Sequence, residues 1–279
     1  MPVRGRIGAP PPVGAPCRDL QGDSLKGSLQ DALGDSSRAP RRGMVLAAGL
    51  GLRMRPITET IPKPLIRVAG RTLLDRAIDR LREAGVAEIV VNAHYLGAQI
   101  ERHLRDRQGP RCTVSFEPAR LETGGGVARA LPLLGDDAFF VVNSDIILLN
   151  GPRPALANLA AAWDGSRMDA LLLLHRVVAA PGYDGAGDFF MGQRGRLRRR
   201  QDPHLAPFLF TGVQMLHPRL FSQAPAGAFS LNVLYDRAMM AGRLHGLVHD
   251  GQWFHVGQPR QIDTVAACLA SQRRSVPSR

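Results

Sequence analysis

The stretch M-V-L-A-A-G-L-G-L-R-M-R-P, residues 44–56, determines how the rest of the chain is interpreted. Its first five residues are apolar and predict a buried β-strand, Met44–Ala48, which a glycine-rich loop follows. Gly49 and Gly51 let the backbone approach a phosphate without interference from a Cβ atom, so that amide N–H groups can face the anion. The stretch therefore predicts a phosphate-binding loop at the end of a strand.

Three cations accompany this loop. Arg53 and Arg55 can neutralise the outer phosphates of a triphosphate, and we favour Arg53 for this role. Lys63 stands between Pro62 and Pro64, which makes it a fixed point charge suited to a further phosphate. The P-K-P segment makes the whole string more specific than a lone G-x-G.

Two other glycine-rich motifs compete for the same loop. A dinucleotide-binding turn needs the third glycine of G-x-G-x-x-G, and Met54 stands at that position. A P-loop needs G-K-[ST], which the sequence lacks. The dinucleotide turn is thus disfavoured and the P-loop is excluded.

The chain after the loop alternates between helical and strand-like patterns. Thr72 and Asp75 form a capping box at the start of an apolar helical stripe, and Gly85 is placed to end that helix. The further expected elements are strands at Glu88–Asn92, Cys112–Phe116 and Ala138–Val142, a helix that carries Leu96, Ile100 and Leu104, and a helix that begins within Gly124–Leu134.

This alternation predicts an α/β fold with a mostly parallel sheet and helices on both faces. Ligands of such sheets bind at the carboxyl ends of the strands. We therefore expect the chemistry in the loops after Ala48, near Asn92 and after Val142. Residues 163–257 are patterned more weakly and are expected to add strands that complete a substrate pocket.

Two more motifs lie at strand or helix ends. The three glycines of L-E-T-G-G-G-V, residues 121–127, either let a planar base pack against the backbone or simply form a turn into a helix. Asp145 ends the segment V-V-N-S-D, residues 141–145. Its carboxylate is well placed to bind Mg²⁺ beside a phosphate, although an aspartate after a strand is also a common turn former.

Together these motifs resemble the signature of the sugar-phosphate nucleotidyltransferases, which share a Rossmann-like mixed sheet. The resemblance implies an enzyme that joins a nucleoside triphosphate to a sugar 1-phosphate and releases pyrophosphate. It implies Mg²⁺ as cofactor, with Mn²⁺ as the alternative, and Arg53, Lys63 and Asp145 as catalytic residues. The residues that it assigns to the nucleotide are Ala48, Gly49, Gly51, Leu52, Arg53, Lys63, Gly124, Gly125 and Asn143.

Three later stretches narrow the resemblance: G-A-G-D-F (185–189), F-T-G-V-Q-M-L-H-P-R-L-F (210–221) and A-G-A-F-S-L (226–231). With L-E-T-G-G-G they are similar to the compact N-acetylmuramate 1-phosphate uridylyltransferases of cell-wall recycling. This implies UTP and N-acetylmuramate 1-phosphate as substrates, with sugar contacts from Asp188, Thr211 and Gly212. GTP with mannose 1-phosphate and dTTP with glucose 1-phosphate remain alternative pairs.

One segment departs from the family pattern. Where members usually have W-x-D-V-G, whose aspartate is a second metal ligand, this chain has W-F-H-V-G with His255. His255 could bind the metal itself, weakly or with a preference for Mn²⁺, or Asp250 could reach the site. The site could also use one carboxylate with phosphate oxygens and water. A catalytically silent nucleotide-binding regulator is the remaining alternative, and we favour a working site.

Composition constrains partners and location. The net charge of +12 comes almost entirely from scattered arginines without interleaved aromatic residues, which favours a basic surface over a nucleic-acid site. The three cysteines have no metal-ligand spacing. No apolar run approaches the roughly 20 residues that cross a bilayer. We therefore expect no nucleic acid or membrane partner and a cytoplasmic location, while the oligomeric state cannot be predicted.

Domain boundaries follow from the same composition. Residues 1–43 are rich in Pro, Gly, Ser and Arg, which predicts a disordered extension. Either translation begins at Met44 or the extension is a short regulatory tail. The nucleotidyltransferase domain is expected at residues 44–270, and residues 271–279 are expected to form a flexible tail.

Overall fold

The computed structural model describes residues 39–275, so most of the predicted extension and the last four residues lie outside the described residues. Strand β1 (Arg42–Leu46) begins two residues before the expected boundary at Met44. Its first residue, Arg42, is paired with Glu88, and its Nε lies 2.8 Å from Oε2. Helix α7 (Arg260–Ser275) continues past residue 270, where we expected the domain to end.

Four parallel strands form the half of the main sheet that carries the predicted motifs. Their spatial order is β5-β4-β1-β6, so the chain moves outward from β1 on one side and returns to its other side with β6. The gap between β1 and β6 is a topological switch point, where α/β sheets bind their ligands. The other three strands are β4 (Glu88–Ala93), β5 (Arg111–Phe116) and β6 (Phe139–Asn143).

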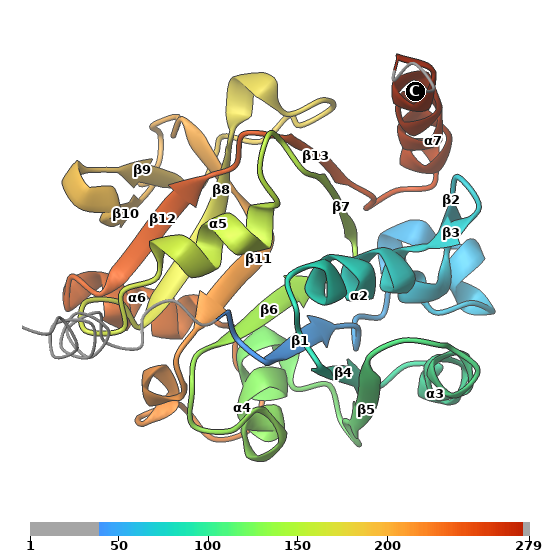
Figure 1. Cartoon of the computed structure of the whole chain (residues 1–279), viewed down its shortest axis with the longest axis horizontal. Coiled ribbons are helices and arrows are strands. Elements are labelled where there is room, and N and C mark those ends of the chain that lie inside the picture. The colour runs from blue at the N-terminus through green and yellow to red at the C-terminus, as the bar shows by residue number, and fades with distance from the viewer. Residues whose placement is uncertain (1–38, 276–279) are drawn as a thin grey trace, which may run out of the picture. The chain divides into compact units, whose positions relative to one another are not determined.

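A mainly antiparallel extension, in which only β12 pairs parallel with β8, completes the described sheet beyond β6 (Figure 1). Strand β11 (Phe208–Leu216) pairs antiparallel with β6, and a bulge between Phe210 and Gln214 interrupts its pairing with β8. The predicted Rossmann-like mixed sheet with flanking helices is therefore confirmed. The remaining strands of this sheet are β8 (Ala170–Arg176), β9 (Phe189–Met191), β10 (Leu197–Arg199) and β12 (Leu244–Val248).

Helices bury both faces of the sheet because successive strand side chains point to opposite faces. Val45 packs in the core beneath α2 (Leu73–Glu83), whereas its neighbour Met44 packs in the core beneath α4. Thr72 caps α2 by accepting a hydrogen bond from the Asp75 N–H, as the capping box predicts. The other helices are α3 (Gly97–Arg105), α4 (Glu122–Leu134), α5 (Ala155–Ala162) and α6 (Asn232–Met240).

Short elements complete the fold. Strand β7 (Ile146–Leu149) follows β6 almost at once and pairs antiparallel with β13 (Gln252–His255). Strands β2 (Arg67–Val68) and β3 (Arg71–Thr72) form a hairpin near α7. The 3₁₀ turns are Leu52–Met54, Ile57–Glu59, Lys63–Leu65, Val177–Ala179, Gln193–Gly195 and Pro218–Phe221.

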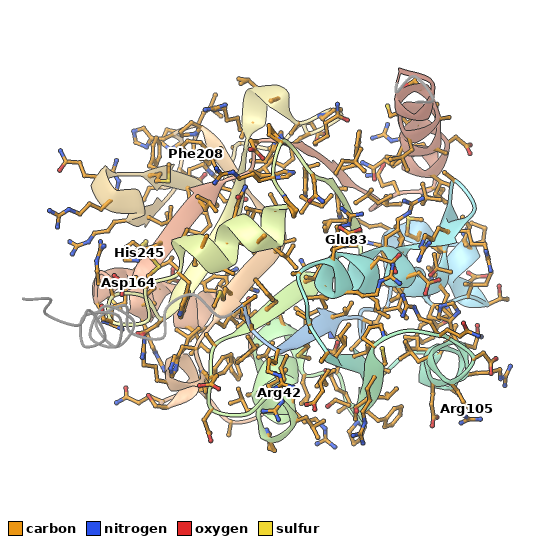
Figure 2. All side chains as sticks on the ribbon, in the orientation of Figure 1. Arg42, Glu83, Arg105, Asp164, Phe208 and His245 are labelled. Atoms are coloured by element: carbon orange, nitrogen blue, oxygen red, sulfur yellow. The ribbon has the colours of Figure 1, made fainter. Side chains whose placement is uncertain are left out.

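The charged side chains are dispersed over the described surface, as their scatter in the sequence predicts. Exposed ionic side chains, Arg105 and Asp164 among them, are distributed around the periphery of the fold (Figure 2). Within residues 39–275, none of the helices has both the length and the apolar character required to cross a membrane.

A partly buried ionic network joins α2 to α3 and the segment after it. Arg107 donates from Nε to Asp75 Oδ1 (2.9 Å) and from Nη2 to Asp79 Oδ1 (2.8 Å), and His103 Nε2 lies 3.1 Å from Asp75 Oδ1. Burial opposes ionisation of Asp75. Hydrogen bonds from Thr72 and His103 together with the Arg107 contact nevertheless hold its pKa below the ordinary value of 3.8.

This network predicts a specific pH dependence of stability. Because the folded pKa of Asp75 is depressed, its stabilising contribution is complete above pH 3.8 and is lost as the pH falls through the folded value. The difference in unfolding free energy between the wild type and Asp75→Asn, measured by urea denaturation, should therefore shrink on acidification. A difference that stays constant from about pH 6 to pH 2.5 would contradict this explanation.

Candidate active site

The glycine-rich loop leaves β1 after Leu46 and turns back at Gly51. Gly51 has a φ of +65°, and a Cβ atom there would lie 2.9 Å from Thr58 Cγ2 and 3.1 Å from Lys63 Cβ. Thr58 Oγ1 also donates to the Gly51 carbonyl (2.9 Å). Gly51 is therefore required by the fold itself, because its turn brings Lys63 against the loop.

Gly49 has a different role. Its φ lies outside the left-handed range, and no atom lies within 4 Å of the position that a Cβ atom would occupy. Its backbone lines the cavity described below. Protein packing therefore does not explain a glycine at this position, and its place in the cavity lining leaves its backbone open to a ligand.

Lys63 and Asp145 meet across this cavity. Lys63 Nζ donates to Asp145 Oδ2 (2.7 Å), and the two side chains are 12% and 27% exposed. Pro62 and Pro64 flank the lysine within a 3₁₀ turn, and Asp145 follows the carboxyl end of β6. Burial opposes ionisation of Asp145, but His255 and the charge of Lys63 hold its pKa well below the usual range.

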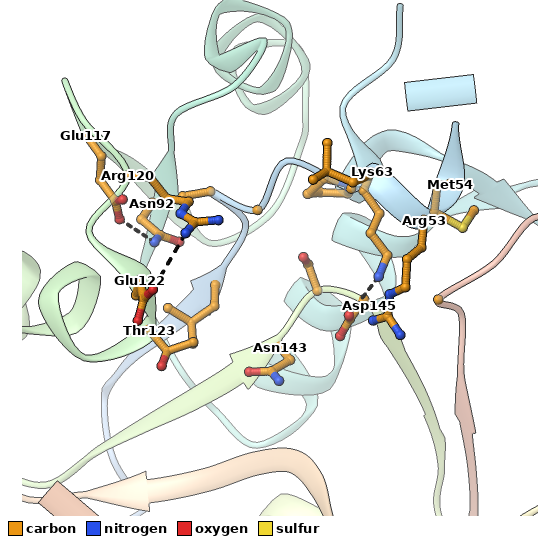
Figure 3. Close-up of a pocket in the computed structure, with 18 of the residues that line it drawn as sticks. Arg53, Met54, Lys63, Asn92, Glu117, Arg120, Glu122, Thr123, Asn143 and Asp145 are labelled. Carbon is orange, nitrogen blue, oxygen red and sulfur yellow. Dashed lines mark hydrogen bonds and ion pairs between the residues drawn. The ribbon is translucent and has the colours of Figure 1, made fainter. Parts of the chain in front are cut away.

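The cavity has a volume of about 590 Å³ and opens at the carboxyl ends of β1, β4 and β6. Figure 3 shows Lys63, Arg53 and Asp145 at one end, and Asn92, Glu117, Arg120 and Glu122 at the other. Arg55 does not line it, which favours Arg53. The lining residues are Leu46, Ala48, Gly49, Gly51, Leu52, Arg53, Met54, Lys63, Pro64, Asn92, Glu117, Arg120, Glu122, Thr123, Asn143, Ser144, Asp145, Ser230 and Gly257.

His255 reaches the same carboxylate through the β7–β13 pairing. Its register partner is Ile146, and its Nε2 lies 3.4 Å from Asp145 Oδ2. The imidazole stacks on the Trp253 ring with an interplanar angle of 8°. Asp250 lies beyond the opposite end of β13, about 16 Å along an extended strand, so the hypothesis that it reaches the metal site is wrong.

The residues present fit a divalent metal held partly by substrate. Asp145 would offer one hard oxygen ligand, and the neighbouring His255 would offer one nitrogen. No group of three or more His, Cys, Asp or Glu side chains suited to a metal occurs within the described part of the chain. Mg²⁺ sites of nucleotide enzymes commonly use one or two carboxylates with phosphate oxygens and waters, and this donor set matches that type.

The structure contradicts the assignment of Gly124 and Gly125 to the nucleobase. Both residues are buried in the first turn of α4, and both N–H groups donate to the Phe229 carbonyl (2.8 and 3.1 Å). A Cβ atom at Gly124 would lie 2.3 Å from the Phe229 ring, and one at Gly125 would lie 2.4 Å from the Gly227 carbonyl. These glycines let α4 pack against the A-G-A-F segment, which lies a hundred residues later.

The first two residues of α4 line the cavity in their place. Glu122 and Thr123 do so from the start of α4, and Glu122 has a positive φ of +59°, which is uncommon for this residue type. Glu117 lies just past the carboxyl end of β5 and is completely buried. The rule that pointed to Asn92 and Asp145, a polar side chain at a strand end, would also have found Glu117.

The three predicted sugar contacts lie in different surroundings. Thr211 is fully buried and its hydroxyl donates to the Leu173 carbonyl (2.8 Å), so the prediction that its side chain contacts a sugar is wrong. Asp188 Oδ2 accepts from the Phe210 N–H (2.7 Å), which fixes β9 against β11. Gly212, with a φ of +84°, packs against the side chain of Asn143, and Asn143 lines the cavity.

Comparison with known proteins identifies the family. Residues 43–224 match the MobA-like NTP transferase domain. The chain belongs to this family of nucleotidyltransferases. It is 42% identical to the N-acetylmuramate alpha-1-phosphate uridylyltransferase of Caulobacter vibrioides over 84% of this chain and 99% of that protein. The enzyme of the same name from Neisseria meningitidis serogroup B is 36% identical over 77% of this chain and 93% of that protein.

A solved structure supports the fold assignment. The inositol-1-phosphate CTP transferase from T. maritima superposes with a TM-score of 0.68 at 18% identity, covering 87% of this chain and all of that one. The Rossmann-like sheet thus carries the motifs found in the sequence. The predicted resemblance to the sugar-phosphate nucleotidyltransferases is confirmed.

The two loop glycines should respond differently to substitution. Gly51→Ala forces a left-handed backbone on alanine, which costs roughly 1–2 kcal/mol, and crowds Thr58 and Lys63. Gly49→Ala should leave the melting temperature unchanged but weaken nucleoside triphosphate binding at least about 10-fold, or 1.4 kcal/mol. Thermal unfolding and calorimetric titration measure the two effects. Unchanged triphosphate affinity in Gly49→Ala would show that the triphosphate does not closely approach Gly49.

Proposed function

We propose that the chain transfers UMP from UTP to N-acetylmuramate α-1-phosphate and releases pyrophosphate, in the recycling of cell-wall sugars. The observation that carries this proposal is the Lys63–Asp145 contact of 2.7 Å inside a cavity bordered by the open backbone of Gly49. The match to two uridylyltransferases of that name, at 42% and 36% identity over 99% and 93% of their lengths, supports the choice of substrates.

The proposed reaction is a direct in-line displacement. A phosphate oxygen of the sugar 1-phosphate attacks the α-phosphorus of UTP, the bond to the bridging oxygen breaks, and pyrophosphate leaves with that oxygen. The protein needs to position the reactants and neutralise charge rather than form covalent bonds. We assign Lys63 to the α-phosphate and Arg53 to the departing pyrophosphate.

The same assignment extends to the metal and the remaining ligands. Asp145 and His255 would hold Mg²⁺ or Mn²⁺, which when bound supplies additional neutralisation of phosphate charge. An imidazole ligand favours Mn²⁺ over Mg²⁺ because Mg²⁺ prefers oxygen donors. Asn143 is assigned to the sugar or ribose, and the end of the cavity near Glu122 to the base.

Removal of either member of the central pair should abolish most turnover. Lys63→Ala and Asp145→Ala should each reduce the rate of pyrophosphate release at least about 100-fold while the folded structure, measured by circular dichroism, persists. Arg55→Ala is the matched control, because Arg55 lies in the same loop but outside the cavity lining. Near-normal turnover in either of the first two variants would refute these role assignments.

The substrate assignment is tested with a panel of reactions. Pyrophosphate release by the wild type is measured with four nucleoside triphosphates and several sugar 1-phosphates, each with Mg²⁺ and with Mn²⁺. We expect release with UTP and N-acetylmuramate α-1-phosphate, and a higher rate with Mn²⁺ if His255 is a ligand. Release only with GTP and mannose 1-phosphate, or only with dTTP and glucose 1-phosphate, would refute the proposed substrates and identify that pair in their place. Nucleotide binding without any release would instead identify a silent regulator.

A further inference from the structure

A chain of buried hydrogen bonds connects the glycine-rich loop to the start of α4. The Ala47 N–H donates to Asn92 Oδ1 (2.7 Å), and Asn92 Nδ2 donates to Glu117 Oε1 (2.6 Å). The other carboxylate oxygen of Glu117 accepts from the Leu121 N–H (3.0 Å). The chain thus begins at the first residue after β1 and ends at the last residue before α4.

Burial makes the members of this chain depend on one another. Asn92 is 2% exposed and Glu117 is 0% exposed. Water cannot readily replace a lost partner at such positions, so each broken hydrogen bond leaves a costly unsatisfied group. The Asn92–Glu117 contact lies at the end of the cavity opposite Lys63 (Figure 3).

Surrounding groups hold Glu117 in place. The backbone N–H of Glu117 donates to the Ala93 carbonyl (2.8 Å), and His94 Nδ1 lies 2.8 Å from the carbonyl oxygen of Glu117. Helix α4 lies directly over the carboxylate, because a Cβ atom at Gly126 would lie 2.7 Å from Glu117 Oε1 and 2.8 Å from Asn92 Nδ2. The carboxylate therefore has little freedom to move if one of its partners is lost.

We propose that Glu117 is a positioning residue that fixes the glycine-rich loop relative to the start of α4, with Asn92 as the intermediate. This role rests on the proposed function only in that a nucleotide would span the cavity between these two segments. Glu117 acts through the two backbone amides, and it needs no contact with the reacting atoms.

The first experiment measures the coupling without any ligand. In Glu117→Gln the side chain keeps its shape, but an NH₂ group now faces one of the two N–H donors, and the neutral amide oxygen accepts more weakly from the other. We expect hydrogen–deuterium exchange to accelerate roughly 10-fold at Leu121 and also at Ala47, which residue 117 does not contact. The control is Tyr235→Phe, which removes a buried hydrogen bond to Gln214 outside both segments. Faster exchange at Leu121 alone would overturn the proposal.

A compensating pair of substitutions gives the sharper test. With Asn92→Asp and Glu117→Gln combined, the aspartate can accept from the Ala47 N–H and from the glutamine amide, while the glutamine oxygen accepts from Leu121. Every hydrogen bond of the chain is then restored. Asn92→Asp alone places two carboxylates together, so both single variants should be impaired and the double variant should recover.

Kinetics distinguishes positioning from general loss of stability. Glu117→Gln should raise KM for the triphosphate and lower kcat, with kcat/KM reduced about 10- to 100-fold, while KM for the sugar phosphate stays unchanged. The double variant should return to within about 3-fold of the wild type. A lowered kcat at unchanged KM, or no recovery in the double variant, would overturn the role.

Failure of the proposed function would be visible separately. A wild type that releases no pyrophosphate from any substrate pair would refute the proposed reaction. The exchange rates at Ala47 in the two single variants and the double variant would still decide the role of Glu117. Exchange equal to that of the wild type in all three would refute it.

Discussion

The ion pair between Lys63 and Asp145 is the constraint on which the rest of the site depends. It joins residues that are 82 positions apart in the chain, one in the loop after β1 and one after β6. Because β1 and β6 are adjacent and parallel, their carboxyl ends bring both loops to the switch point of the sheet. The sheet topology therefore creates the charged end of the cavity, and the loops supply its chemistry.

The ion pair also bears on how the proposed anionic substrate would bind. In the free protein the lysine satisfies a partly buried carboxylate, and His255 lies near the same carboxylate oxygen. The phosphate of the proposed substrate would compete for the lysine, which would then leave the carboxylate and imidazole free for the proposed cation. The pair is thus consistent with a ground state that is prepared for both nucleotide and metal.

Much of the fold could be predicted because its signals are local. The capping box of Thr72 and Asp75 places the start of α2 correctly, and the apolar runs place β4, β5 and β6 within one residue at each end. Helix α4 was less well predicted, because its first turn carries three glycines that favour a loop by propensity alone. Its position depends on packing against Phe229, a long-range contact that local pattern cannot show.

The placement of several candidate residues around the cavity was also predictable from local motifs, although their roles remain a proposal. Gly49, Lys63 and Asp145 follow from motifs at strand ends, whereas the burial of Thr211 depends on β8 and on Trp253, which donates to the Thr211 carbonyl (2.9 Å).

A crystal structure with a non-hydrolysable UTP analogue and Mn²⁺ tests the central claim most directly. The account predicts the triphosphate over Gly49, with Lys63 moved from Asp145 to an α-phosphate oxygen. A nucleotide bound outside this cavity, or Lys63 still paired with Asp145 beneath a bound triphosphate, would contradict it.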